Sequence, residues 1–379
     1  MKICLTVNSS PWSKFKGGGQ LAVHQLACAL IDQGQEVHVV YSKCKEEYFD
    51  IEVPYEIHWA RHHDIATINF NIFSYCSVLR PLAAKEQFDV IHGNAEEAYF
   101  SNAIARETGS DYVFTFHAPH IPRTGMLGGL INPLRFMKSI NTYLLRGAVS
   151  SAQRIVTFSQ FSRDIIVTAL GNNFVDRVEV VSPGIDPSWL EVKRNCVPTP
   201  HLLFWGRIEE EKGLTELLKS MKKISTKVPE AKLTLVGEGT QLQGYKRMVA
   251  DQGLSDRVEF PGWLTTQAIQ QLAAKCSLGV FPSRIESFGL SVVEAMAGGL
   301  PVLAACAGAI PENVEDGITG TLIPKENPNA LAGALVKALK DPERQEVFAC
   351  KARGVVRQKF SWNVAASKMI KLYKALRKE

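Results

Sequence analysis

One stretch in the second half of the chain decides the fold class. Residues 281–302 read FPSRIESFGLSVVEAMAGGLPV. An apolar strand that ends at Phe281 leads into a loop, and a helix starts near Gly289. The helix stops at Gly298-Gly299, just before the next apolar strand. A strand, a helix and a further strand in this order form the repeating unit of a parallel α/β sheet.

The same alternation extends over all 379 residues and predicts two α/β units. Apolar runs rich in Val, Ile and Phe alternate with amphipathic stretches, the first of which is Gln20 to Gln33. The runs expected as strands of the first unit are Ile3 to Val7, Glu36 to Tyr41, Val90 to His92, Tyr112 to Phe116, Ile155 to Phe158 and Val178 to Val181. Those of the second unit are Leu202 to Trp205, Lys232 to Val236, Val258 to Phe260, Leu278 to Phe281, Val302 to Ala304 and Gly320 to Ile323.

The best candidate for a linker is Ser182 to Pro187, because its Pro and Gly residues stop regular structure. The boundary is therefore expected after residue 183. The last nineteen residues, Ser361 to Glu379, have the pattern of one amphipathic helix. In a simple tandem of domains that helix would cap the second unit.

Composition limits the class of protein. The chain is 46% hydrophobic and 21% charged, which excludes disordered, collagenous and coiled-coil proteins. A net charge of +5 with mixed signs argues against a dedicated nucleic-acid-binding protein. The eight cysteines form no C-x-x-C pair and are expected to be reduced core thiols. Met1-Lys2 leads directly into a strand, and no apolar stretch has the length of a membrane span, so we expect a cytoplasmic protein.

Two glutamates frame the helix in the stretch quoted above. The free amides of Gly289 and Leu290 at the helix N-terminus can bind a phosphate. Glu294 lies one turn into the helix, where its carboxylate can accept two ribose hydroxyls. Glu286, in the loop, is expected to point beyond the phosphate. The alternative is that Glu286 only favours the helix dipole and that Glu294 is a solvated helix residue.

A second loop carries positive charge. Residues 206–213 read GRIEEEKG and follow an apolar run, at the strand end where open α/β sheets bind ligands. Arg207 and Lys212 could neutralise a diphosphate without a metal ion, or they could simply be solvated charges beside three glutamates. No D-x-D dipeptide and no cluster with metal-ligand spacing occurs in the sequence, so we expect a phosphate site without metal.

Two further features lie in the first unit. Gly17, Gly18 and Gly19 precede the first helix, where backbone amides can approach a phosphate closely. The alternative is that the three glycines form only a flexible loop. The loop is too long for a dinucleotide fingerprint and contains no G-x-G-x-x-G. His117 follows an expected strand and has either a structural or a functional role.

Taken together, these segments resemble the large family of retaining GT-B glycosyltransferases called family 4. Glu286 and Glu294 match the E-x7-E element of that family, and the flanking residues match as well. The resemblance implies an α/β fold with two Rossmann-like, doubly wound domains that face each other across a cleft. It also implies that the final helix crosses back to the first domain. The expected domains are therefore residues 1–183 with 361–379, which bind the acceptor, and residues 184–360, which bind the donor.

The resemblance also implies a role for each site residue. Arg207 and Lys212 would bind the donor diphosphate together with the backbone of Gly289 and Leu290. Glu294 would bind the ribose, Glu286 and Phe288 the transferred sugar, and Trp263 and Leu264 the nucleotide base. From the first domain, His117 would reach the donor sugar near its 6-position, and Gly17, Gly18 and Gly19 would contact the phosphate. Gln20 stands where many relatives carry an acidic residue.

The expected activity is a metal-independent, retaining transfer of a hexose from a nucleotide-diphosphate sugar. UDP-sugars are favoured as donors, and GDP-mannose is possible. The acceptor is expected to be a hydroxyl of a glycan, glycolipid or small molecule, with no cofactor and no nucleic acid. Two alternatives stay open: a GT-B nucleotide-sugar epimerase or hydrolase, and a sugar-binding protein without catalysis. The stretch from His117 to Arg154 could form an acceptor loop and a helix on an anionic membrane, or a core-facing helix with a basic solvent side.

Overall fold

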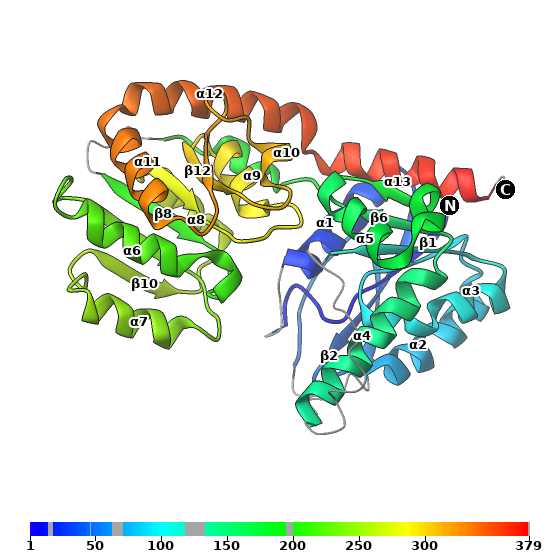
Figure 1. The fold of residues 1–379 in the computed structure, drawn as a ribbon. Coiled ribbons are helices and arrows are strands. Elements are labelled where there is room, and N and C mark those ends of the chain that lie inside the picture. The colour runs from blue at the N-terminus through cyan, green and yellow to red at the C-terminus, as the bar shows by residue number, and fades with distance from the viewer. Residues whose placement is uncertain (14–17, 46, 63–70, 118–132, 195–199, 378–379) are drawn as a thin grey trace. The chain divides into compact units, whose positions relative to one another are not determined.

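The computed structural model describes residues 1–13, 18–45, 47–62, 71–117, 133–194 and 200–377, without the side chains of 133–141 (Figure 1). The chain divides into two compact units. Unit 1 comprises Met1–Gly184 with Trp362–Glu379, and unit 2 comprises Ile185–Ser361. The boundaries expected from sequence differ from these by one residue.

Unit 1 is built on a parallel sheet of seven strands in the order β3-β2-β1-β4-β5-β6-β7. The strands are β1 Lys2–Thr6, β2 Glu36–Lys43, β3 Glu56–Arg61, β4 Val90–Gly93, β5 Asp111–Phe116, β6 Arg154–Thr157 and β7 Val178–Val180. The helices are α1 Gly18–Asp32, α2 Asn71–Glu86, α3 Ser101–Thr108, α4 Pro133–Ser151, α5 Gln160–Leu170 and α13 Trp362–Leu376. Of these strands only β3, a short edge strand with polar residues at positions 56, 58 and 61, was not predicted from the sequence.

Helices cover both faces of this sheet and make two cores. On one face, α1 and α13 pack against the sheet, with Leu30 and Tyr373 fully buried. On the other face, α2 to α5 pack against side chains such as Ile91 and Phe114. Burial on both faces explains why these strands are nearly continuous apolar runs.

The last helix completes unit 1 rather than unit 2. Gln33 Nε2 donates to the Asn363 carbonyl at 2.7 Å, and Ser367 Oγ donates to Gln33 Oε1 at 2.9 Å. Gly184 lies so close to this helix that a Cβ there would be 2.3 Å from the Trp362 nitrogen. The chain therefore leaves unit 1 at Gly184 and re-enters it beside the same residue.

Unit 2 is built on a second parallel sheet, with six strands in the order β10-β9-β8-β11-β12-β13. The strands are β8 His201–Trp205, β9 Lys232–Val236, β10 Val258–Gly262, β11 Leu278–Phe281, β12 Val302–Cys306 and β13 Thr321–Pro324. The helices are α6 Leu214–Ile224, α7 Leu242–Asp251, α8 Thr266–Ala273, α9 Leu290–Ala297, α10 Ile310–Asn313, α11 Pro328–Lys340 and α12 Pro342–Lys359. Two Rossmann-like α/β units confirm the predicted fold class.

None of the helices in the described parts of the chain has the length and apolarity needed to cross a bilayer. The seven cysteines that the structure describes are free thiols. Only Cys4, Cys44 and Cys276 of these are buried, so the expectation of core thiols is wrong for the other four, which are partly exposed (Cys28 and Cys76) or exposed (Cys306 and Cys350).

Candidate active site

In unit 2, the N-terminus of α9 is built by a glycine in a left-handed conformation. Gly289 has φ +83° and caps α9, so the chain turns sharply between the loop and the first helical residue, Leu290. Asn313 Nδ2 donates to the Phe288 carbonyl at 2.5 Å and fixes the residue before the turn. The first amides of a helix have no carbonyl partner within the helix, so this end favours an anion.

Lys212 and Glu286 form an ion pair, and Glu286 lies in the loop that leads into α9. Lys212 Nζ lies 2.7 Å from Glu286 Oε1, and each side chain is 17% exposed. Ser283 Oγ donates to the same carboxylate oxygen at 2.8 Å. The sequence-based reasoning placed these two residues in one site, and the structure brings them into direct contact.

Close backbone packing holds both members of the pair. Gly213, next to Lys212, has φ +67°, and a Cβ there would be 2.0 Å from the Pro282 carbonyl. Gly308 has φ +58°, and its Cβ would be 2.1 Å from the Glu286 carbonyl. That carbonyl accepts a hydrogen bond from the Ala309 amide at 3.0 Å. The two loops therefore have no room for side chains at these glycines.

Arg207 differs from Lys212 in its surroundings. Its side chain is 72% exposed, and its Nη2 pairs with Glu211 Oε1 at 2.7 Å. An exposed pair of this kind contributes little to stability, so its guanidinium is readily released to another anion. The structure does not place Arg207 in the Lys212–Glu286 pair.

Glu294 is held one turn inside α9. Trp205 Nε1 donates to Glu294 Oε2 at 2.8 Å. Burial of the carboxylate raises the pKa of Glu294 to about 7, more than the Trp205 hydrogen bond lowers it. A carboxylate in this state changes charge near neutral pH.

Trp205 is a site residue that the sequence-based reasoning missed. Its indole stacks on Trp189 with centroids 5.4 Å apart and meets Phe281 edge-on at 5.0 Å. Both contacts orient the Nε1 donor toward Glu294. The available signal was the position of Trp205 at the end of its strand, immediately before Gly206.

Trp263 and Leu264, the two residues expected to hold the base, differ in their surroundings. Trp263 follows β10 and is 50% exposed. Leu264 lines a cavity of about 290 Å³ between the sheet and α8. The other residues that line this cavity are Thr234, Glu259, Pro261, Ala268, Gln271, Leu272 and Lys275.

In unit 1, the structure brings Gly19 and His117 together. Gly18 and Gly19 begin α1, whereas Gly17 lies outside the described residues. A Cβ at Gly19 would be 3.7 Å from His117 Nδ1, while a Cβ at Gly18 would meet nothing within 4 Å. Gln20 Nε2 donates to Asn8 Oδ1 at 2.7 Å, so the residue at the position of the family acid is already hydrogen-bonded.

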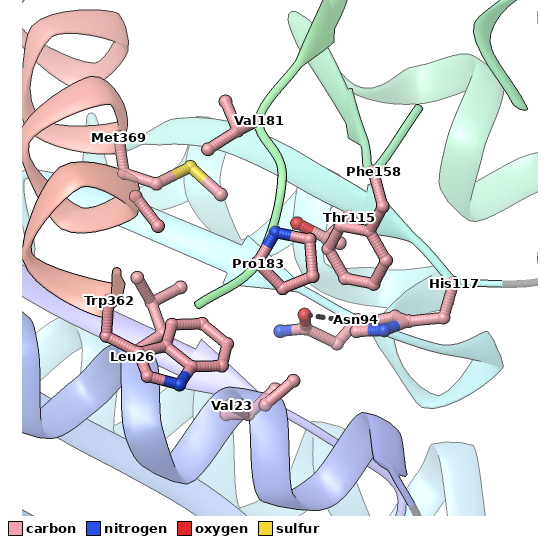
Figure 2. A pocket seen from close by; sticks show the side chains of 12 residues that line it. Val23, Leu26, Asn94, Thr115, His117, Phe158, Val181, Pro183, Trp362 and Met369 are labelled. Carbon is pink, nitrogen blue, oxygen red and sulfur yellow. Dashed lines mark hydrogen bonds between the residues drawn. The ribbon is translucent and has the colours of Figure 1, made fainter. Parts of the chain in front are cut away.

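His117 is held in one tautomer by Asn94. Asn94 Nδ2 donates to the Thr6 carbonyl at 3.0 Å, so its Oδ1 accepts from His117 Nε2 at 3.0 Å (Figure 2). The ring meets Phe158 edge-on at 5.0 Å. Burial lowers the pKa of His117 to about 4, so the imidazole is neutral at pH 7 and Nδ1 is its acceptor nitrogen.

A small pocket is lined by His117 on one side and by residues of α13 on another. It has a volume of about 20 Å³, room for one water molecule. Figure 2 shows Val23 and Leu26 of α1 and Met369 of α13 on its walls. The Trp362 indole also lines this pocket.

A chain of hydrogen bonds links α13 to the same strand ends. Tyr373 Oη lies 2.6 Å from His92 Nδ1, and His92 Nε2 lies 2.7 Å from Thr115 Oγ1. Burial lowers the pKa of His92 to about 3, so this ring is also neutral. His92 therefore has a structural role within these contacts.

A buried acid lies next to these strand ends. Glu97 is 2% exposed and accepts from the Ala95 amide at 3.2 Å and from Thr6 Oγ1 at 3.4 Å. Burial raises the pKa of Glu97 to about 8. Nothing in the sequence separated this residue from its neighbour Glu96.

Comparisons with known proteins agree with this architecture. The family model described as Glycosyltransferase Family 4 matches residues 16–189, and the model described as Glycosyl transferases group 1 matches residues 192–355. The chain is 26% identical to an uncharacterized glycosyltransferase of Methanocaldococcus jannaschii over 94% of both chains. It is 28% identical to a glycogen synthase of Mycobacterium tuberculosis, over 76% of this chain and 69% of that one.

Solved structures share the fold at lower identity. A sucrose-phosphate synthase from Thermosynechococcus elongatus superimposes with a TM-score of 0.83 at 22% identity, covering 99% of this chain and 98% of that one. A protein of Anabaena, solved in complex with UDP and glucose, gives a TM-score of 0.75 at 20% identity, covering 99% of each chain.

Proposed function

Because the chain belongs to glycosyltransferase family 4, we propose that it transfers a hexose from a nucleotide-diphosphate sugar to a hydroxyl acceptor, with retention of the anomeric configuration. One observation carries this proposal. Lys212 and Glu286 are paired beside the N-terminus of α9, and Glu294 lies one turn further along that helix. We therefore assign Lys212 and the amides at the N-terminus of α9 to the phosphates, Glu286 to the sugar and Glu294 to the ribose.

Each group has a part in breaking the sugar–phosphate bond. Negative charge develops on the leaving nucleotide, where Lys212, Arg207 and the amides of Gly289 and Leu290 stabilise it. Positive charge develops on the sugar ring, near Glu286 and Phe288. Glu294 accepts the ribose hydroxyls, with Trp205 holding its carboxylate in place.

We propose that the acceptor hydroxyl gives its proton to the leaving phosphate. The phosphate leaves from the same face of the sugar that the acceptor attacks. No separate general base is then needed. Lys212 and Arg207 neutralise the diphosphate, so the transfer needs no divalent ion. The contacts that the family resemblance implies for His117, Gly18 and Gly19 of unit 1 remain predictions.

Relatives support UDP-sugars as the first donors to test and GDP-mannose as the second. The Anabaena protein was also solved with UDP-glucose. A relative in Mycolicibacterium smegmatis, 25% identical over 58% of this chain and 61% of that one, is a GDP-mannose-dependent mannosyltransferase. Trp263 and Leu264 are the proposed contacts of the base.

A ligand panel tests the donor proposal directly. UDP, GDP, ADP and their sugars are added to the full chain with EDTA present, and the thermal midpoint is measured. One nucleotide is expected to raise the midpoint, and the shift should persist in EDTA. If no nucleotide stabilises the chain, the proposal fails.

The acceptor is proposed to be a hydroxyl of a cell-surface glycan or glycolipid. Residues 118–132 of the stretch expected to meet it lie outside the described residues. In the described half of α4, Leu144 and Ala148 are buried, and Arg146 Nη2 donates to the Ala169 carbonyl at 3.2 Å, which fits the core-facing alternative. Co-sedimentation with liposomes of increasing anionic lipid content tests a membrane role. A bound fraction that does not change with the anionic lipid content argues against it.

An epimerase or hydrolase would act on the nucleotide sugar alone. Incubation of the stabilising nucleotide sugar without acceptor separates the two activities. We expect no turnover beyond slow hydrolysis until an acceptor is added.

A further inference from the structure

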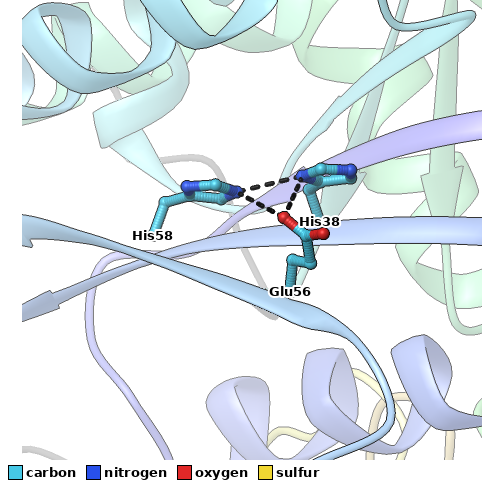
Figure 3. Close-up of side chains that lie close together, drawn as sticks. All are labelled: His38, Glu56 and His58. Atoms are coloured by element: carbon cyan, nitrogen blue, oxygen red, sulfur yellow. Dashed lines mark hydrogen bonds and ion pairs between the residues drawn. The ribbon is translucent and has the colours of Figure 1, made fainter. Parts of the chain in front are cut away.

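Two histidines and a glutamate meet at the edge of the unit 1 sheet, away from the residues discussed above. His38 lies on β2, and Glu56 and His58 lie on the edge strand β3 (Figure 3). The parallel register pairs His38 with Glu56 and Val40 with His58. Both strands are close to their amino ends here, whereas Asn94 and His117 follow the carboxyl ends of β4 and β5.

The three ligand atoms have the spacing of a metal site. His38 Nδ1 is 3.0 Å from His58 Nε2 and 3.5 Å from Glu56 Oε2, and the last two atoms are 4.0 Å apart. The point equidistant from all three lies about 2.1 Å from each, which is the bond length of Zn²⁺ to histidine nitrogen and carboxylate oxygen. The His38 and His58 rings are nearly parallel, with centroids 5.3 Å apart, so their two nitrogens point at each other, and the rings must turn for both nitrogens to coordinate one ion.

The second nitrogen of His38 is already held by a carboxylate. His38 Nε2 lies 3.3 Å from Glu36 Oε1, and Lys2 Nζ holds that same oxygen at 2.8 Å. Phe88 meets the His38 ring edge-on at 5.1 Å. Carboxylates that orient the far nitrogen of a ligating histidine are typical of zinc sites.

Exposure leaves room for entry and for a water ligand. The side chain of His38 is 1% exposed, that of His58 is 24% exposed, and that of Glu56 is 71% exposed. A buried anchor with two more accessible ligands lets an ion enter from solvent and keep water in its fourth position. Imidazole and carboxylate ligands favour Zn²⁺ over Mg²⁺ or Ca²⁺, which prefer oxygen ligands alone.

We propose that His38, Glu56 and His58 bind one Zn²⁺ ion that fastens the edge strand β3 to β2. The sequence contained no sign of this site, because 17 residues separate His38 from Glu56 along the chain and only strand pairing brings them together. The ion has a structural role, distinct from the donor chemistry proposed for unit 2.

The test uses the full chain without an affinity tag, stripped with chelator and desalted. Zinc is titrated by calorimetry into wild type, His58→Gln, Glu56→Gln and, as a matched control in unit 2, His201→Gln. We expect one Zn²⁺ per chain, at least tenfold weaker binding in His58→Gln, weaker binding in Glu56→Gln, and wild-type binding in His201→Gln. Zinc should also slow hydrogen exchange in β3.

Zinc binding that is absent from wild type, or unchanged in His58→Gln, overturns the proposal. His58→Gln carries a partly exposed change, and a wild-type circular dichroism spectrum shows that it has folded. UDP binding by the same variant should remain at the wild-type value, which separates this site from the donor site.

Discussion

Glu294 carries a titratable charge at the place proposed for the ribose. Its pKa is raised to about 7 by burial, so the free protein loses the carboxylate as the pH falls through 7. A protonated carboxyl offers one acceptor fewer to the ribose hydroxyls. We therefore expect nucleotide affinity to fall below pH 7, by up to about tenfold per pH unit.

Calorimetry with UDP between pH 5.5 and 8.5 measures this dependence. Glu294→Gln should bind more weakly at pH 8 and lose the pH dependence, while the exposed Glu230→Gln should keep it. A wild-type affinity that is flat across the range contradicts the ribose role.

Glu286 is expected to serve the transfer step more than nucleotide binding. Glu286→Ala removes the charge beside the sugar and leaves Lys212 for the diphosphate, so kcat should fall by about 10² or more. The UDP dissociation constant should change by less than about threefold. The control is Glu211→Ala, which breaks the exposed pair with Arg207 and should keep most of its activity. Near-normal turnover in Glu286→Ala excludes the proposed role.

Glu97 links protonation to stability in unit 1. Its pKa is about 8 in the folded chain and about 4.3 when unfolded, so unfolding releases a proton between these pH values. The contribution of Glu97 to the free energy of unfolding should therefore be greatest below the unfolded pKa and fall as the pH rises toward 8, by up to about 1.4 kcal/mol per pH unit.

Urea unfolding between pH 5 and 8.5 tests this sign. Glu97→Gln should flatten the dependence, whereas the exposed Glu107→Gln on α3 should reproduce the wild-type curve. A wild-type stability that rises with pH over this range contradicts the effect.

At the scale of elements, the loop that carries Lys212 depends on a glycine with two requirements. Gly213 needs both a left-handed conformation and space, since a Cβ would be 2.0 Å from the Pro282 carbonyl. Gly253 offers a matched control, because it has φ +65° and nothing within 4 Å of a Cβ. Gly253→Ala should lose about 1 kcal/mol from the conformation alone. Gly213→Ala should lose more and should also weaken UDP binding, as urea unfolding and calorimetry will show.

Most elements were predictable because their signals are local. Buried parallel strands are apolar runs, and Gly298-Gly299 ends α9 as expected. The edge strand β3 was missed because it is short and its polar residues Glu56, His58 and Arg61 interrupt the apolar run. Trp205 and Glu97 were missed because their roles depend on burial and on partners distant in sequence. The same holds for His38 and His58, whose proximity depends on the register of two strands.

At the scale of the whole molecule, α13 links the end of the chain to the core of unit 1. Met369 is 3% exposed within that core, so Met369→Ala should cost about 2 kcal/mol or more. The loss should appear as faster hydrogen exchange in β1 and β2, with β8 and β9 unchanged. The exposed Lys371→Ala serves as the control. Equal effects on both sheets would contradict the assignment of α13 to unit 1.

The return of residues 362–379 to unit 1 has a consequence during synthesis. A ribosome adds about 5–20 residues per second, so roughly ten to forty seconds pass between the emergence of Gly184 and that of Trp362. During that time unit 2 is being made, and its last residue, Ser361, precedes all of α13, so the α13 face of unit 1 stays bare until unit 2 is complete in sequence. The second-made half of this chain can therefore begin to fold first, and the nascent first half presents an apolar surface that a chaperone can recognise until α13 has emerged.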